Sequence, residues 1–183
     1  MSQWFDVWDI KKSEEQENLM IPGLQESIKD ITDIIEEEAE IFAMDKIILG
    51  GISQGCATVI LTLLSSRLTL GGFVGLSSWL PFQKDIGNLD TILKLPQEDT
   101  KADNLDKALS SLSIQRGTPV LFTHSKDDEN VPFAHGEALQ EMIKQQGFDV
   151  TWKEYEDGGH WIHSKHGVDD ISEFLLRCMD ESS

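Results

Sequence analysis

The stretch that decides the fold is Lys46–Cys56, KIILGGISQGC. Its first half, Lys46–Gly51, is a short apolar run that ends in glycines, as a buried strand does. The residues at 54–66 (QGCATVILTLLSS) are apolar on nearly every face, which predicts a buried helix. Between the two, residues 51–55 read G-x-S-x-G, and the glycines allow the sharp strand-to-helix turn that this motif needs. The segment therefore predicts an α/β fold with Ser53 at the carboxyl end of a strand.

Upstream of this stretch the sequence predicts a helix. It begins near Pro22, because proline is tolerated in the first turn of a helix. Apolar residues then recur at three-, four- and seven-residue spacing: Leu24, Ile28, Ile31, Ile35 and Phe42. The many acidic residues between them indicate either a docking surface for a basic partner or a solvated face. The solvated face is favoured, because most charge runs in helices face water.

Downstream of the stretch, strands and helices alternate. Further strands are predicted at Gly72–Leu76, Pro119–His124 and Val150–Tyr155, and further helices at about 134–146 and Val168–Met179. This alternation indicates one α/β domain over residues 1–183, a parallel sheet with helices on both faces. Residues 83–116 are polar and weakly patterned, which predicts an insertion over the surface near the candidate site.

The composition excludes several classes of protein. The chain has 183 residues, with 15 Lys and Arg against 33 Asp and Glu, and a formal net charge of −18 at pH 7. Such a chain repels phosphate backbones, which argues against nucleic-acid binding. No apolar run approaches the ~18–20 residues of a membrane span, and the start, MSQWFDVWDIKK, does not read as a secretory signal. Two cysteines, Cys56 and Cys178, are too few for a disulfide framework and lack metal-ligand spacing, so we expect a cytoplasmic protein.

Ser53 is the candidate nucleophile. The helix that follows it points its N-terminus at the same spot, so the backbone N–H of Gln54 would face a developing oxyanion. The alternative is an incidental serine in a glycine-rich turn. The strand before the motif and the apolar helix after it favour the nucleophile.

A nucleophilic serine needs a base, and five histidines compete for that role. His124 lies at a strand end and His135 on a predicted helix, whereas His163 and His166 are expected to be exposed to solvent. His160 follows the fourth predicted strand in a tight loop, D-G-G-H. Loops at the carboxyl ends of parallel strands gather at one edge, where Ser53 also emerges, so His160 is the predicted base.

The base in turn needs an orienting carboxylate, expected between the serine and the histidine along the chain. The loop after the third predicted strand offers Asp127, Asp128 and Glu129. The residues alone do not separate Asp127 from Asp128, and either would also suit a turn or a helix cap.

Taken together, these motifs resemble the phospholipase/carboxylesterase family of α/β-hydrolases, which includes the acyl-protein thioesterases. The similar stretches occur in the family's order and span nearly the whole chain: Trp4-Phe5-Asp6, IILGGISQGC around Ser53, GLSSWLPF at 75–82, HSKDDENVP at 124–132 and YEDGGH at 155–160. The family's triad acid stands three residues before the Val of Val-Pro, which is Asp128 here. Its nucleophile and base match Ser53 and His160. Ser125 stands where the family usually has glycine after the strand-end histidine.

The resemblance implies hydrolysis of a carboxylic ester or thioester through an acyl-enzyme on Ser53, with no metal or organic cofactor. The substrate would be a small molecule, a lipid or an acylated protein. Trp79 and Leu80, in the segment WLPF, resemble the family's substrate-facing loop, although core packing is an equal alternative for them. Two other functions stay open: a catalytically silent relative that acts through association, and a hydrolase of a lactone or small metabolite ester.

Relatives in the family begin earlier and carry several strands and a glycine-rich His-Gly loop that completes the oxyanion hole. Here only MSQ precedes Trp4, so we expect an N-terminally truncated fold and a slower enzyme. Loss of one oxyanion donor costs about 10²–10³ in turnover. The strand at 46–51 would then lie at a sheet edge with unpaired backbone groups, which predicts a homo-oligomer through this strand or a separately supplied N-terminal piece.

Overall fold

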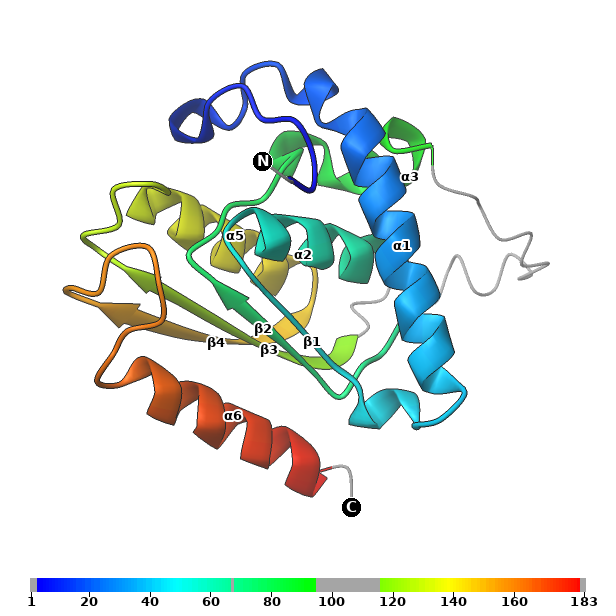
Figure 1. The fold of residues 1–183 in the computed structure, drawn as a ribbon, viewed down its shortest axis with the longest axis vertical. Helices are drawn as coiled ribbons and strands as arrows, with labels where there is room; N and C mark the ends of the chain where they lie inside the picture. Colours follow the sequence, from blue (N-terminus) through cyan, green and yellow to red (C-terminus); the bar gives the residue numbers. More distant parts are fainter. Residues whose placement is uncertain (1–2, 67, 95–115, 182–183) are drawn as a thin grey trace.

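The structure, a computed structural model, describes residues 3–66, 68–94 and 116–181. Its centre is a parallel sheet in the order β1-β2-β3-β4 (Figure 1). The strands are β1 Ile48–Ile52, β2 Gly72–Leu76, β3 Arg116–Ser125 and β4 Phe148–Tyr155. The predicted α/β class and its strands are confirmed, with shifts of a few residues at their ends.

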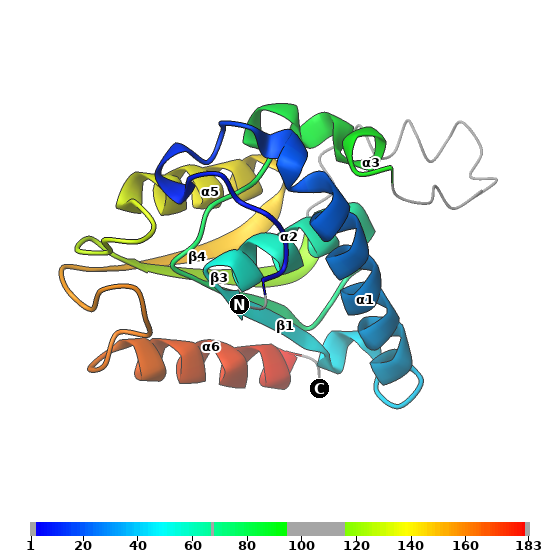
Figure 2. The same ribbon diagram turned by 45° about the horizontal axis from the view of Figure 1, so that its top comes forward.

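Helices cover both faces of this sheet, as predicted. On one face lie α1 Ile21–Ala39, α2 Gln54–Ser66 and α5 Phe133–Gln145, and on the other lies α6 Gly167–Glu181 (Figures 1 and 2). The short helices are η1 Ile10–Lys12, η2 Glu17–Leu19, η3 Met44–Lys46, η4 Gln83–Asn88 and α3 Leu89–Ile92. In the described part of the chain, no helix combines the length and the apolar character that a membrane span needs.

The apolar residues predicted to form the buried face of α1 are buried, with one exception. Leu24, Ile28, Ile31 and Ile35 are buried in the larger core. Phe42 was expected to continue their stripe, but α1 ends at Ala39 and Phe42 is 52% exposed beyond it. The spacing of Phe42 fits a helical face, but the helix does not extend that far.

The segment predicted as a polar insertion at 83–116 is only partly described. Residues 83–92 form η4 and α3, and a turn follows at 93–94. Leu89 and Leu93 are buried in the larger core, so this part packs against the domain rather than lying over its surface. Residues 95–115 lie outside the described part of the chain.

Because the strands are parallel, the carboxyl ends of all four lie at the same edge of the sheet. Backbone bonds tie this edge together: Ser53 N–H donates to Leu76 O at 2.9 Å, and Ser77 N–H to Thr123 O at 2.9 Å. The loops that carry the candidate residues leave the sheet at this edge, as in other open α/β sheets.

Candidate active site

The turn between β1 and α2 holds Ser53 in a strained conformation. Ser53 has φ of 54°, in the left-handed region that residues with a Cβ seldom adopt. Gly51 allows α2 to approach, since a Cβ at Gly51 would lie 2.6 Å from Cys56 N. Ser78, in the loop after β2, donates its hydroxyl to Ser53 O at 2.8 Å and supports the turn. This strand–turn–helix geometry is that of a nucleophile elbow.

Gln54, the first residue of α2, links the elbow to the start of the chain. Its side chain accepts from Trp4 N–H at 3.1 Å and donates to Phe5 O at 2.7 Å. Its backbone N–H lies in the first turn of α2, where a helix has no intrahelical acceptor for it. The N-terminal end of the helix dipole adds a favourable potential for an anion there.

Asp128 and His160 are brought together at the same edge of the sheet. His160 Nδ1 lies 2.8 Å from Asp128 Oδ2, and a carboxylate only accepts, so Nδ1–H is the donor when Asp128 is ionised. The other oxygen of Asp128, Oδ1, accepts from the backbone N–H of Asn130 at 2.9 Å and of Val131 at 3.0 Å. The carboxylate is therefore held in a fixed orientation within the loop after β3.

The Asp128 side chain is fully enclosed, with 0% of it exposed. Burial alone raises the pKa of a carboxyl group, but the hydrogen bonds from His160, Val131 and Asn130 outweigh it and hold the pKa of Asp128 below its ordinary value. Asp128 is thus an anion at neutral pH, and it faces the imidazole of His160.

Asp127, which the sequence did not separate from Asp128, has a different role. Its carboxylate accepts from the backbone N–H of Gly159 at 2.8 Å and of Gly158 at 3.3 Å. Both glycines have positive φ, 131° at Gly158 and 63° at Gly159, so the loop before His160 uses conformations that favour glycine. Asp127 holds the loop, while Asp128 contacts the histidine.

Ser53 and His160 both leave the carboxyl edge of the sheet, but no hydrogen bond joins their side chains in the described part of the chain. Catalytic hydrogen bonds are often long in enzymes without substrate and tighten when it binds.

The other four histidines have different surroundings. His124 is buried, and His135 on α5 lies 3.3 Å from Ser13 Oγ through Nδ1. His166 is exposed, as expected, but His163 is not. His163 is buried because its ring stacks on Tyr155 at 4.4 Å and on His166 at 5.4 Å.

Cys56, in the first turn of α2, is a further nucleophilic side chain close to the elbow. It is completely buried, and burial raises the pKa of its thiol to about 12. A thiol with that pKa carries almost no thiolate at neutral pH and is inert. Among the residues that the structure describes, no group of three or more His, Cys, Asp or Glu side chains could hold a metal ion.

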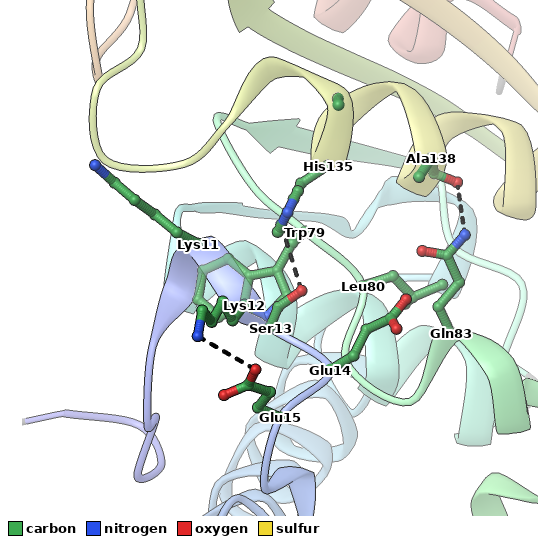
Figure 3. Close-up of a pocket in the computed structure, with 11 residues that line it drawn as sticks. Lys11, Lys12, Ser13, Glu14, Glu15, Trp79, Leu80, Gln83, His135 and Ala138 are labelled. Carbon is green, nitrogen blue, oxygen red and sulfur yellow. Dashed lines mark hydrogen bonds and ion pairs between the residues drawn. The ribbon is translucent and has the colours of Figure 1, made fainter.

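A cavity of about 330 Å³ lies between the segment at 11–15, the loop after β2 and helix α5 (Figure 3). Trp79 and Leu80 line it, with Ala134 and Ala138 of α5. Trp79 is 1% exposed and its ring packs edge-on against Phe5 at 6.2 Å, which agrees with the core-packing alternative, while its contact with substrate stays a prediction. The same loop contacts the elbow through Ser78, but neither Ser53 nor His160 is among the residues that line the cavity.

The sequence analysis did not predict three supporting contacts. Asp127 accepts from the glycine N–H groups before His160, Ser78 donates to the carbonyl of Ser53, and the Gln54 side chain bonds to the backbone of Trp4 and Phe5. Each depends on which distant backbone group comes within reach. No local pattern signals such contacts, although the sequence left a turn or cap role open for either aspartate.

A parallel sheet with a serine elbow after one strand and an Asp–His pair after two others defines an α/β-hydrolase. The model of the phospholipase/carboxylesterase family matches residues 1–97 and 102–179. The chain belongs to this family.

Individual relatives agree with this assignment. The chain is 31% identical to carboxylesterase SOBER1 of Arabidopsis thaliana over 187 residues, which cover 100% of this chain and 71% of the relative. It is 29% identical to acyl-protein thioesterase 1 of Gibberella zeae over 180 residues, which cover 97% of this chain and 68% of the relative. The crystal structure of Arabidopsis SOBER1 superposes with a TM-score of 0.72 at 27% identity and covers 98% of this chain and 75% of that one.

Proposed function

We propose that this chain is a serine hydrolase of carboxylic esters and thioesters in which Ser53 is the nucleophile, His160 the base and Asp128 the orienting acid. The observation that carries the proposal is the 2.8 Å bond from His160 Nδ1 to Asp128 Oδ2, at the same sheet edge as the strained turn of Ser53. The names of the relatives, a carboxylesterase and an acyl-protein thioesterase, support the choice of bond.

The acylation step follows from the tautomer of His160, that is, from which ring nitrogen carries the hydrogen. Since Nδ1–H donates to Asp128, Nε2 carries the lone pair and takes the proton of Ser53 Oγ as this oxygen attacks the carbonyl carbon. The carbonyl π electrons move to its oxygen, which accepts a hydrogen bond from Gln54 N–H. When the intermediate collapses, the alkoxide or thiolate leaves with the proton from Nε2, and the acyl group remains on Ser53.

The deacylation step reverses these roles with water. Nε2 takes a proton from water as the water oxygen attacks the acyl carbon, and then returns a proton to Ser53 Oγ as the carboxylic acid leaves. Asp128 stays ionised throughout, because its role is to hold the ring and stabilise the imidazolium.

The acyl group of the substrate is proposed to bind beside Trp79 and Leu80 in the cavity of about 330 Å³. Trp79, Leu80, Ala134 and Ala138 offer apolar surface to a hydrocarbon chain, while Lys11, Glu14 and Glu15 add charged groups to the lining. The substrate could be a small molecule, a lipid or an acylated protein, since each presents the same acyl carbonyl.

The test is the intact mass of the chain after exposure to a fluorophosphonate, compared with that of Ser53→Ala. The expected result is one adduct on the parent and none on Ser53→Ala, because only an activated serine displaces the fluoride. Ser172→Ala is the matched control, since this exposed serine of α6 donates only to Val168 O within its own helix. Its adduct should equal that of the parent.

Hydrolysis of p-nitrophenyl acetate by the same three proteins extends the test to turnover. We expect hydrolysis by the parent and Ser172→Ala, and a loss of about 10³-fold or more in Ser53→Ala. A folded parent that forms no adduct and releases no nitrophenol would refute the proposal and favour a catalytically silent relative that acts through association.

A further inference from the structure

His124 is a buried histidine at the end of β3 that the triad does not include. It is 1% exposed, and its ring packs edge-on against Phe133 at 5.7 Å and tilted against Trp152 at 6.4 Å. Helix α5 passes so close that a Cβ at Gly136 would lie 2.2 Å from His124 Nδ1. The ring is therefore packed closely against α5 and against two aromatic rings.

The surroundings also decide which nitrogen of His124 carries a proton. Nε2 lies 3.0 Å from Val131 O and 3.3 Å from Asp128 Oδ2. A carbonyl and a carboxylate only accept, so Nε2 carries the hydrogen and donates it to Val131 O. Burial lowers the pKa of His124, although the hydrogen bond to Val131 and the charge of Asp128 act to raise it. The ring is therefore neutral at neutral pH, and Nδ1 carries no hydrogen.

Four N–H groups thus surround the enclosed carboxylate of Asp128. Two backbone N–H groups, of Asn130 and Val131, bond to Oδ1, while Oδ2 accepts from His160 and faces His124 Nε2. Val131 takes part twice, because its N–H donates to Asp128 and its carbonyl accepts from His124. The loop that carries Asp128 thus contacts the ring of His124 through both Val131 and Asp128.

We propose that His124 is a positioning residue, whose Nε2–H holds the Val131 turn and the Asp128 carboxylate so that Oδ2 stays aimed at His160. The proposal rests on the proposed function, since it assigns His124 a task in assembling that triad. Without this N–H, Val131 O is left buried with no donor, and the turn must shift to find one. The carboxylate moves with the turn, away from His160.

The test compares His124→Gln with His124→Phe. Glutamine keeps an amide N–H close to the position of Nε2, whereas phenylalanine fills the same space without a donor. The readouts are the rate at which a fluorophosphonate labels Ser53 at neutral pH and the midpoint of thermal unfolding. We expect His124→Phe to slow labelling about tenfold or more, and His124→Gln to recover most of that loss.

The comparison of labelling rate with stability separates positioning from simple packing. Phenylalanine fills the space of the ring, so a packing role predicts similar labelling rates in the two variants. A positioning role predicts that only His124→Gln keeps most of the rate of the parent. If both variants lose rate and stability equally, His124 is only a packing residue and the proposal is overturned.

A double variant provides the second control. In an Asp128→Asn background, His124→Phe should slow labelling little further, because the group through which it acts is already altered. A full additional tenfold loss there would overturn the proposal.

Failure of the proposed function would be distinguishable. If the parent is never labelled, NMR still reports the low-field Nδ1–H proton of His160. That signal should persist in the parent and in His124→Gln and disappear in His124→Phe. A signal unchanged in His124→Phe would count against the role of His124 whether or not the chain is an enzyme.

Discussion

At the scale of single residues, two adjacent aspartates divide the work of one loop. Asp128 points inward to His160 and is fully enclosed, while Asp127 points to the backbone of Gly158 and Gly159. Neutral asparagine at each position separates the two roles. Asp128→Asn should lower the turnover of p-nitrophenyl acetate by about 10³–10⁴-fold, because His160 then loses the anion that selects its tautomer.

Asp127→Asn is the matched control, because asparagine keeps one acceptor for the glycine N–H groups. It should cost about tenfold or less, the loss of a single weakened hydrogen bond. Turnover by both variants at neutral pH, with circular dichroism to verify folding, checks the assignment. Equal losses in the two variants would contradict it.

At the scale of elements, the β1–α2 turn depends on a glycine that the helix covers. Gly51→Ala should lower the free energy of unfolding by about 1–3 kcal/mol, because the new Cβ would lie 2.6 Å from Cys56 N and α2 would have to move. The elbow would move too, so labelling of Ser53 should also slow. Gly87→Ala in η4 is the control, since no atom lies within 4 Å of the position of its Cβ. Urea unfolding of both variants tests this, and a Gly51→Ala protein as stable as Gly87→Ala would refute it.

The elements that the sequence predicted well are those whose own residues determine them. The apolar run of β1, the all-round apolar helix α2 and the stripe of α1 each carry a periodic signal. Prediction failed where long-range contacts decide. Leu89 and Leu93 belong to a polar segment, but their side chains are buried in the core. His163 was expected to be exposed, but it is buried because its ring stacks on Tyr155 and His166. Ser53 and His160 were predicted from their turns, whereas the prediction of Asp128 over Asp127 needed the resemblance; in the structure the contacts of the two carboxylates differ in the way that this prediction requires.

At the scale of the whole molecule, the sheet has an open edge at β1. In the described ranges β1 pairs with β2 alone, and its five residues are half-buried or, at Gly50, exposed. The outward N–H and C=O groups of such a strand are a template for another strand. Against this works the net charge of −18, which makes two copies repel each other at low ionic strength.

These opposing effects predict a self-association through β1 that strengthens with protein concentration and with salt. Light scattering should show the mean mass rising above that of one chain as either increases, because salt screens the repulsion between copies. Hydrogen exchange locates the contact: a peptide covering β1 should become more protected at high concentration, while central β2 stays unchanged. Ile48→Lys provides the variant, since a charge on an edge strand discourages pairing. This variant should stay monomeric. The prediction is contradicted if the parent is also monomeric at every protein and salt concentration and its β1 amides exchange rapidly.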